Sequence, residues 1–173
     1  MIRTTVFPGR YVQGVGAIAR LGQELQRFGP KSFLLCSPFV LDNLLPAFRD
    51  DIEQGVQVQV ERFGGECSDE EIERVVKAAR DFGASSITGM GGGKTLDTAK
   101  AAGFMAGVPA ASVPTTASTD APTSALAVIY TPEGQFKRYL FLPTNPALVL
   151  VDTQVVTSAP IRFLVSGMGD ALA

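Results

Sequence analysis

The sequence has 173 residues, 46% of them hydrophobic, so it can form one domain with a core of ordinary size and is not a disordered chain. Fifteen basic and 17 acidic residues give a net charge of −2, without the basic cluster typical of nucleic-acid-binding proteins. The sequence has neither the continuous apolar run of a signal peptide nor the roughly 18 apolar residues of a membrane span, so we expect no export and no membrane partner.

Cysteine and histidine usage narrows the chemistry further. Cys36 and Cys67 stand far apart and form no C-x-x-C pair, so we expect two reduced thiols in a cytoplasmic protein. The sequence contains no histidine. Because histidine is the commonest general base and metal ligand, any catalysis that depends on imidazole must be completed from elsewhere.

The first predicted helix carries Ile18, Leu21, Leu25 and Phe28 on one face and ends near Gly29. Apolar runs and period-two alternation then predict two strands, with a helix between them in which Pro46 is an unfavourable residue. These elements are a helix over 18–28, a strand over 32–36, a helix over 39–51 and a half-buried strand over 56–60.

The next predicted helix has the clearest signature. Ser68 precedes Glu71 by three residues, the spacing of a capping box, and apolar residues at helical spacing continue to Phe82. Short strands over 86–88 and 110–113 then flank a helix over 95–105. The alternation of strands and helices predicts an α/β fold with a parallel sheet.

After Pro114 the pattern changes. Strand-like runs over 126–130 and 136–141, separated by a turn, predict a β-hairpin. The apolar run over 148–151, which Asp152 closes, predicts another buried strand. The stretch 160–173 begins like a helix but stops without a cap, so we expect the chain to end inside an element of a longer protein.

The segment Gly89-Met90-Gly91-Gly92-Gly93-Lys94-Thr95 follows a predicted strand and opens a predicted helix. Consecutive glycines let backbone N–H groups approach an anion, and the positive end of the helix favours it. Lys94 adds a charge and Thr95 a hydroxyl. We therefore interpret the loop as a phosphate cradle for a nucleotide; the alternative is a plain tight turn.

Neither of two common nucleotide signatures fits this loop. A Rossmann G-x-G-x-x-G would need glycine in place of Lys94, and a Walker A motif would need glycine in place of Thr88. A P-loop nucleotide triphosphatase remains an alternative, since the apolar run before Asp152 resembles the acidic strand that holds magnesium.

Longer motifs are more specific than the glycine loop. They are PGRYVQG from Pro8, FGGECS from Phe63, GMGGGKTLDTAK from Gly89, ASTDAPTSALAVIYT from Ala117, LPTNP from Leu142 and GMGDALA from Gly167. The chain resembles the glycerol dehydrogenases of the metal-dependent, iron-type alcohol dehydrogenase family, whose members are longer and continue into a helical second domain. The resemblance implies a Rossmann-like dinucleotide-binding domain with an added hairpin over 1–160, and the start of the helical metal-binding domain over 161–173.

The resemblance also implies which residues bind the cofactor, NAD. It places Gly92, Gly93, Lys94, Thr95 and Asp97 at the pyrophosphate and adjacent ribose, and Thr115, Ser118, Ser124, Leu126 and Tyr130 along the rest of the dinucleotide. Ser37 departs from the pattern, because family members that prefer NAD carry an acidic residue there, which repels a 2′-phosphate. With Ser37 at this position, NADP is also possible.

Two aspartates complete the implied site. Asp120 resembles the carboxylate that accepts a hydrogen bond from the substrate hydroxyl, and Asp170 the aspartate ligand of a divalent metal, Zn²⁺ or Fe²⁺. The expected reaction is oxidation of glycerol, or a similar small polyol, to dihydroxyacetone by hydride transfer. The resemblance implies that two histidine ligands of the metal come from the second domain, so we expect these 173 residues alone to be inactive. It also implies that the complete protein is a homo-oligomer. A module that only binds the dinucleotide remains a further alternative.

Overall fold

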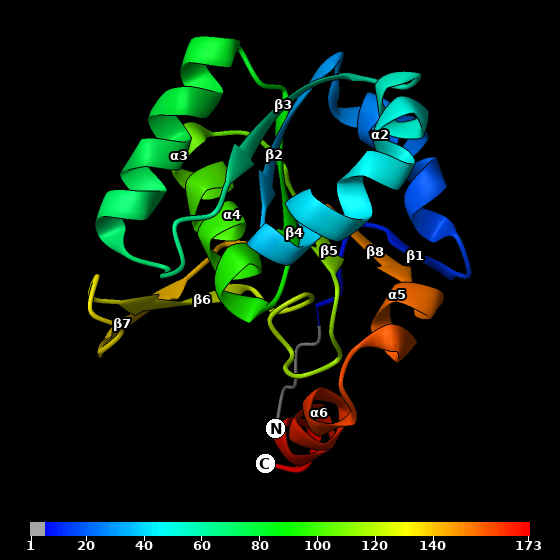
Figure 1. The fold of residues 1–173 in the computed structure, drawn as a ribbon. Coiled ribbons are helices and arrows are strands. Elements are labelled where there is room, and N and C mark those ends of the chain that lie inside the picture. The colour runs from blue at the N-terminus through cyan, green and yellow to red at the C-terminus, as the bar shows by residue number, and fades with distance from the viewer. Residues whose placement is uncertain (1–5) are drawn as a thin grey trace.

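The computed structural model describes residues 6–173 and is built around a six-stranded sheet whose described pairings are all parallel (Figure 1). The strands lie in the order β1-β8-β5-β4-β2-β3. They are β1 (Tyr11–Gly14), β2 (Lys31–Cys36), β3 (Gln57–Arg62), β4 (Ser86–Gly91), β5 (Ala110–Pro114) and β8 (Leu148–Asp152). The structure thus has the α/β architecture that the alternating pattern predicts.

Helices cover both faces of this sheet. The first face is covered by η1 (Ala17–Arg20), α1 (Leu21–Leu25), η2 (Gln26–Phe28), η3 (Val40–Leu44) and α2 (Leu45–Glu53), and the second by α3 (Asp69–Phe82) and α4 (Gly93–Ala106). Strand β2 faces both layers, because Leu34 and Cys36 belong to the core on the first face and Phe33 and Leu35 to the core on the second. Because successive side chains of β2 are buried on opposite faces of the sheet, the fold has three layers, with the sheet between two layers of helices.

Local sequence signals account for several helix boundaries. Ser68 Oγ accepts a hydrogen bond from the Glu71 backbone N–H at 3.2 Å, as the capping-box spacing predicts. The Glu71 carboxylate does not complete the box but accepts a hydrogen bond from Gly64 N–H at 2.8 Å and so holds the loop before α3. Pro46 lies in the first turn of α2, directly after η3, a π-helical segment that continues into α2, so the proline follows a local change in helix geometry.

Three features differ from the sequence-based expectations. The predicted helix over 18–28 is divided into η1, α1 and η2. Strand β1 and the short helix α5 (Thr153–Ser158) lie where no element was expected. By contrast, the last helix, α6 (Ile161–Leu172), agrees with the expectation, since it begins after Pro160.

The hairpin of β6 (Leu126–Tyr130) and β7 (Phe136–Phe141) forms a separate two-stranded antiparallel sheet, as expected. Asp69 at the start of α3 anchors it through ion pairs of 2.8 Å to Lys137 and 2.5 Å to Arg138. Among the described residues, no helix has the length and apolar character needed to cross a lipid bilayer.

The order of the strands places a crevice at one end of the sheet. The chain passes from β2 outward to β3 and from β4 in the opposite direction to β5, so the strand order reverses between β2 and β4. In open α/β sheets, ligands bind at the carboxyl ends of the strands beside such a reversal. Ser37 follows the end of β2. The segment expected as a glycine loop is shorter than predicted, because residues 89–91 belong to β4, residues 93–95 open α4, and only Gly92 lies between them.

Candidate functional site

A cleft of about 590 Å³ opens at the carboxyl ends of β2, β4 and β5, at the reversal of strand order. Its walls come from the segment after β2, the first turn of α4, the loop after β5 and the segment that joins α5 to α6. The lining residues include Ser37, Phe39, Phe63, Gly65, Gly92, Gly93, Lys94, Thr95, Thr115, Thr116, Ser118, Val155, Pro160 and Phe163.

The glycines of the loop serve two different purposes. A Cβ on Gly91, whose φ is +154°, would lie 2.9 Å from Ser37 Cβ and 3.0 Å from Thr95 Oγ1, so the fold itself requires glycine there. Gly92 has φ −84°, and no protein atom lies within 4 Å of its would-be Cβ. A side chain at Gly92 would therefore occupy the cleft without disturbing the fold, as expected where a ligand approaches the backbone closely.

Helix α4 points its N-terminus into this cleft. It begins at Gly93 after Gly92, which makes no side-chain capping bond. The first-turn N–H groups of a helix have no acceptor within the helix, and they carry its positive end. Because glycine at Gly92 and Gly93 leaves these donors open to the cleft, the residues present fit the pyrophosphate of a dinucleotide.

Lys94 is the only charged residue that lines the cleft within residues 6–173. Its ammonium lies 2.6 Å from both carboxylate oxygens of Glu66, and 4.9 Å from the centre of the Tyr130 ring. The sequence-based reasoning missed Glu66, although it belongs to the FGGECS segment that carries the resemblance. Nothing local in the sequence indicates its pairing with a residue 28 positions away.

The residues that the sequence resemblance assigns to the cofactor separate into two groups in the structure. Ser37, Gly92, Gly93, Lys94, Thr95, Thr115 and Ser118 line the cleft. Asp97, Ser124, Leu126 and Tyr130 are not part of that lining, although the Lys94 ammonium lies over the Tyr130 ring, 4.9 Å from its centre.

Asp97 differs most from its expected position beside the pyrophosphate. Its carboxylate is buried, lies 2.9 Å from Lys100 Nζ and accepts a hydrogen bond from Val128 N–H at 3.0 Å. Burial raises the pKa of the Asp97 carboxyl, against the opposing effect of Lys100. Because its oxygens face Lys100 and β6, the geometry gives Asp97 a role in the interior and not a place on the cleft wall.

Lys100, which the sequence-based reasoning did not single out, joins α4 to the segment before β6. Its ammonium donates hydrogen bonds to the backbone oxygens of Ala121 at 2.7 Å, Ser124 at 3.2 Å and Leu126 at 2.5 Å. Ser124 and Leu126 therefore act through their carbonyl groups on a buried cation. The only sequence signal was a lysine three residues after Asp97 in an otherwise small and apolar helix.

Asp120 and Asp170 come together in a neighbouring recess of about 340 Å³ between the loop after β5 and α6. Asp120 N–H donates a hydrogen bond to Asp170 Oδ2 at 2.8 Å. Helix α6 lies close to this loop because Gly167 has no side chain: a Cβ there would lie 2.0 Å from Ala117 O. Nowhere in residues 6–173 do three or more His, Cys, Asp or Glu side chains form a group that could hold a metal ion, so Asp170 fits as one ligand only.

Asp152, the carboxylate that would hold magnesium in the P-loop alternative, has a different role in the structure. Asp152 is buried and accepts hydrogen bonds from the backbone N–H groups of Gly16, Ile18, Gln154 and Val155 at 3.1–3.5 Å. It thus caps α5 and fixes η1 beside β8. Asp152 is also absent from the cleft lining, so it is not placed as a metal ligand beside the glycine loop.

Comparison with known proteins decides the family. The family model described as "Iron-containing alcohol dehydrogenase" matches residues 8–153. The chain belongs to the iron-containing alcohol dehydrogenase family. That assignment confirms the resemblance carried by the glycine loop and the ASTDAPTSALAVIYT segment.

The similar proteins include several glycerol dehydrogenases and, at 43% identity, a glycolaldehyde reductase from Halobacterium salinarum. The chain is 58% identical over 173 residues to a glycerol dehydrogenase from Thermotoga maritima. This match covers all of this chain and 47% of the Thermotoga protein. It is 50% identical to a glycerol dehydrogenase from Pseudomonas putida, of which it covers 48%. The chain thus spans about half the length of the curated relatives that it matches.

Solved structures agree with this assignment to the iron-containing alcohol dehydrogenases. A probable glycerol dehydrogenase from Sinorhizobium meliloti superposes with a TM-score of 0.91 at 43% identity, over 99% of this chain and 46% of that one. The predicted Rossmann-like α/β fold is therefore confirmed as the fold of the first half of such enzymes.

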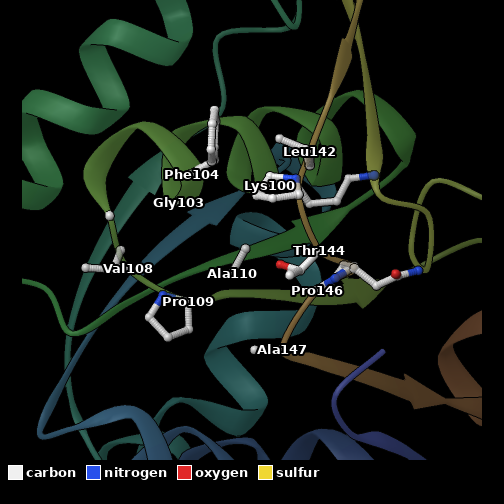
Figure 2. Close-up of a pocket in the computed structure, with 13 residues that line it drawn as sticks. Lys100, Gly103, Phe104, Val108, Pro109, Ala110, Leu142, Thr144, Pro146 and Ala147 are labelled. Carbon is white, nitrogen blue, oxygen red and sulfur yellow. The ribbon is translucent and has the colours of Figure 1, made fainter. Parts of the chain in front are cut away.

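A further cavity of about 350 Å³ lies at the other end of the sheet, between the end of α4, the start of β5 and residues 142–147 (Figure 2). Phe104, Val108 and Pro109 form one side of it, and the ammonium of Lys100 extends away from them toward its carbonyl partners. Apart from Lys100, no charged side chain lines this cavity in the described chain.

Proposed function

We propose that this chain binds NAD, or NADP, as the dinucleotide-binding half of a dehydrogenase that oxidises glycerol, or a similar small polyol, to dihydroxyacetone. One observation carries the proposal. The glycine loop leaves the N-terminus of α4 open to a cleft at the reversal of strand order, and no carboxylate lines that cleft among residues 6–173. The printed names of the relatives at 58% and 50% identity support the choice of substrate.

The roles of the lining residues follow from this position. The first-turn N–H groups of α4 and Lys94 would bind the pyrophosphate, and Thr95 would present its hydroxyl beside it. Thr115 and Ser118, on the loop after β5, would border the nicotinamide half. Ser37, at the end of β2, would lie beside the adenosine ribose, where no charge of its own excludes a 2′-phosphate.

The substrate would bind in the recess of Asp120 and Asp170. Asp170 would supply one ligand to Zn²⁺ or Fe²⁺, and the remaining ligands would belong to a longer protein, as would its homo-oligomeric assembly. When bound, a divalent cation polarises a substrate hydroxyl and stabilises the alkoxide. Asp120 would accept a hydrogen bond from the substrate. We propose residues 1–160 as the dinucleotide-binding domain and residues 161–173 as the start of the metal-binding domain.

A cytoplasmic location is part of the proposal. Cys36 and Cys67 are both free and buried, and they belong to the cores on opposite faces of the sheet. Burial raises the pKa of each thiol to about 12, so neither is an accessible reactive thiolate. Such cysteines are typical of proteins in a reducing compartment.

Calorimetric titration of the chain with NAD, NADP and ATP–magnesium tests the proposal. We expect saturable binding of NAD or NADP without magnesium, and loss of that binding in Gly92→Ala with an unchanged melting temperature. Magnesium-dependent binding of ATP with no dinucleotide binding would instead support a P-loop protein. Dinucleotide binding without polyol oxidation by a complete, metal-loaded gene product would leave a binding-only module.

The side chain at Ser37 tests cofactor choice. Ser37→Asp places a carboxylate at the end of β2, where it repels a 2′-phosphate and can pair with ribose hydroxyls. We expect the ratio of NAD to NADP affinity to rise by about tenfold or more, equivalent to one charge-assisted contact. An unchanged ratio, measured in the same titrations, would place the ribose elsewhere.

A further inference from the structure

The charge of the cleft is the starting point. Lys94 is its only charged lining residue within the described chain, and Glu66 holds that ammonium with both carboxylate oxygens at 2.6 Å. The pair leaves no net charge beside the N-terminus of α4. A triphosphate site needs more positive charge than this, in the form of a free lysine and a bound magnesium ion.

Glu66 is built into the edge of the cleft by its neighbours. It follows Gly65, a lining residue whose φ of +111° favours glycine, in the loop that Glu71 holds through Gly64 N–H. On its other side lies the hairpin turn, where a Cβ on Gly134 would lie 3.4 Å from Glu66 Oε1. Two separate elements therefore flank this carboxylate.

The ion pair is open to solvent at the edge of the cleft. The side chains of Lys94 and Glu66 are 44% and 28% exposed, so an anion bound at the Lys94 ammonium would lie close to the Glu66 carboxylate as well. Lys94 has three N–H donors, which is enough to serve a carboxylate and one phosphate oxygen together. A further terminal phosphate would bring additional negative charge toward Glu66 without a second cation to offset it.

We propose that Glu66 biases the anion selectivity of the cleft: it favours the pyrophosphate diester of a dinucleotide over nucleoside triphosphates. This inference rests on the proposed dinucleotide function and adds a specificity-determining residue to it. Glu66 acts by charge, through Lys94 and through direct repulsion, and not by contact with the reacting atoms.

The expected size follows from Coulomb's law. Free ATP carries roughly two more negative charges than the pyrophosphate of ADP-ribose. With those charges roughly 8 Å from the carboxylate in a water-like medium, neutralising Glu66 should raise the affinity for ATP relative to ADP-ribose by about fivefold at low ionic strength. The effect should shrink to about twofold near 0.1 M salt, where screening acts over about 10 Å.

The experiment titrates the chain and Glu66→Gln with ADP-ribose, ADP and magnesium-free ATP at low and moderate salt. We expect Glu66→Gln to gain affinity in the order ATP, ADP, ADP-ribose. Glu66→Ala should give the same order, which separates loss of charge from a change in side-chain shape. Asp81→Asn, which neutralises an exposed partner of Lys77 far from the cleft, provides the matched control and should leave the ratio unchanged.

The outcomes separate this inference from the proposed function. If the unaltered chain binds ADP-ribose and both Glu66 variants shift ADP-ribose and ATP equally, the charge-selection role is wrong and the dinucleotide function stands. If the unaltered chain binds no ADP-ribose while its melting curve shows a folded domain, the proposed function is itself wrong. Melting curves of both variants confirm that each comparison is made between folded chains.

Discussion

Replacing Lys100 by methionine should be among the most damaging single changes in this chain. The lysine side chain is 1% exposed, and its ammonium contacts the Asp97 carboxylate and three backbone oxygens. Methionine fills a similar volume, so the loss is one of charge and hydrogen bonding. It leaves a buried carboxylate, 8% exposed, without its cation, together with unsatisfied carbonyl groups.

Breaking a buried ion pair by removing one partner destabilises a protein by about 3–5 kcal/mol. For a chain of this size that corresponds to a fall in melting temperature of roughly 6–20 °C. Urea unfolding followed by circular dichroism measures the change in free energy, and the thermal midpoint provides an independent value. Lys77→Met removes an equal charge from an exposed pair and should leave both nearly unchanged.

A second substitution tests the cause. In Lys100→Met combined with Asp97→Asn the remaining partner carries no charge, so we expect part of the lost stability to return. A loss below about 1 kcal/mol for Lys100→Met alone, or a double variant no more stable than the single one, would refute the assignment of Asp97 and Lys100 as a mutually dependent buried pair.

Three further predictions concern the glycine loop and the charged groups around β8. Gly91→Ala should lower the melting temperature because its Cβ would lie 2.9 Å from a neighbouring side chain, whereas Gly92→Ala should melt like the unaltered chain and lose only dinucleotide binding in a parallel titration. The hydrogen bond from Arg10 lowers the pKa of Glu24 from its usual 4.5, so Glu24 stabilises the fold above that pH and this contribution is lost as the pH falls through the lowered pKa. Urea midpoints from pH 7 to pH 3 should therefore fall less steeply in Glu24→Gln, and parallel curves would contradict the pairing. Asp152→Ala removes the acceptor of four backbone N–H groups and should destabilise the chain by about 2 kcal/mol or more in urea unfolding; a change within error would mean that water replaces it.

Elements with a strong local signal were predicted well. The helix after Ser68 carries its own cap and a complete apolar face, and the hairpin has a turn between two strand-like runs. Strand β1 was missed because its four residues are only half buried, and their extended form depends on pairing with β8 some 138 positions away, as Tyr11 pairs with Val149. Such a strand is set by tertiary contacts that no local pattern encodes.

The candidate site divides in the same way. The glycine loop could be recognised because positive φ and close approach are properties of single residues. The partners of its charged groups could not, since Glu66 meets Lys94 across 28 positions and Asp120 meets Asp170 across 50. Asp97 looked like a cofactor residue from its place in the motif, and only the buried ammonium of Lys100 explains why it faces inward.

The contact between α6 and the loop after β5 limits how this protein can be redesigned. Residues 117–120 contribute Ser118 to the dinucleotide cleft and, within the same short segment, the Asp120 N–H that holds Asp170. Gly167 keeps the helix against that segment, since any side chain there would push into Ala117. A substitution meant to enlarge the recess of Asp120 and Asp170, where we propose that the polyol binds, would therefore also move a wall of the cleft proposed for the dinucleotide. A library that varies this recess should be screened for dinucleotide affinity at the same time.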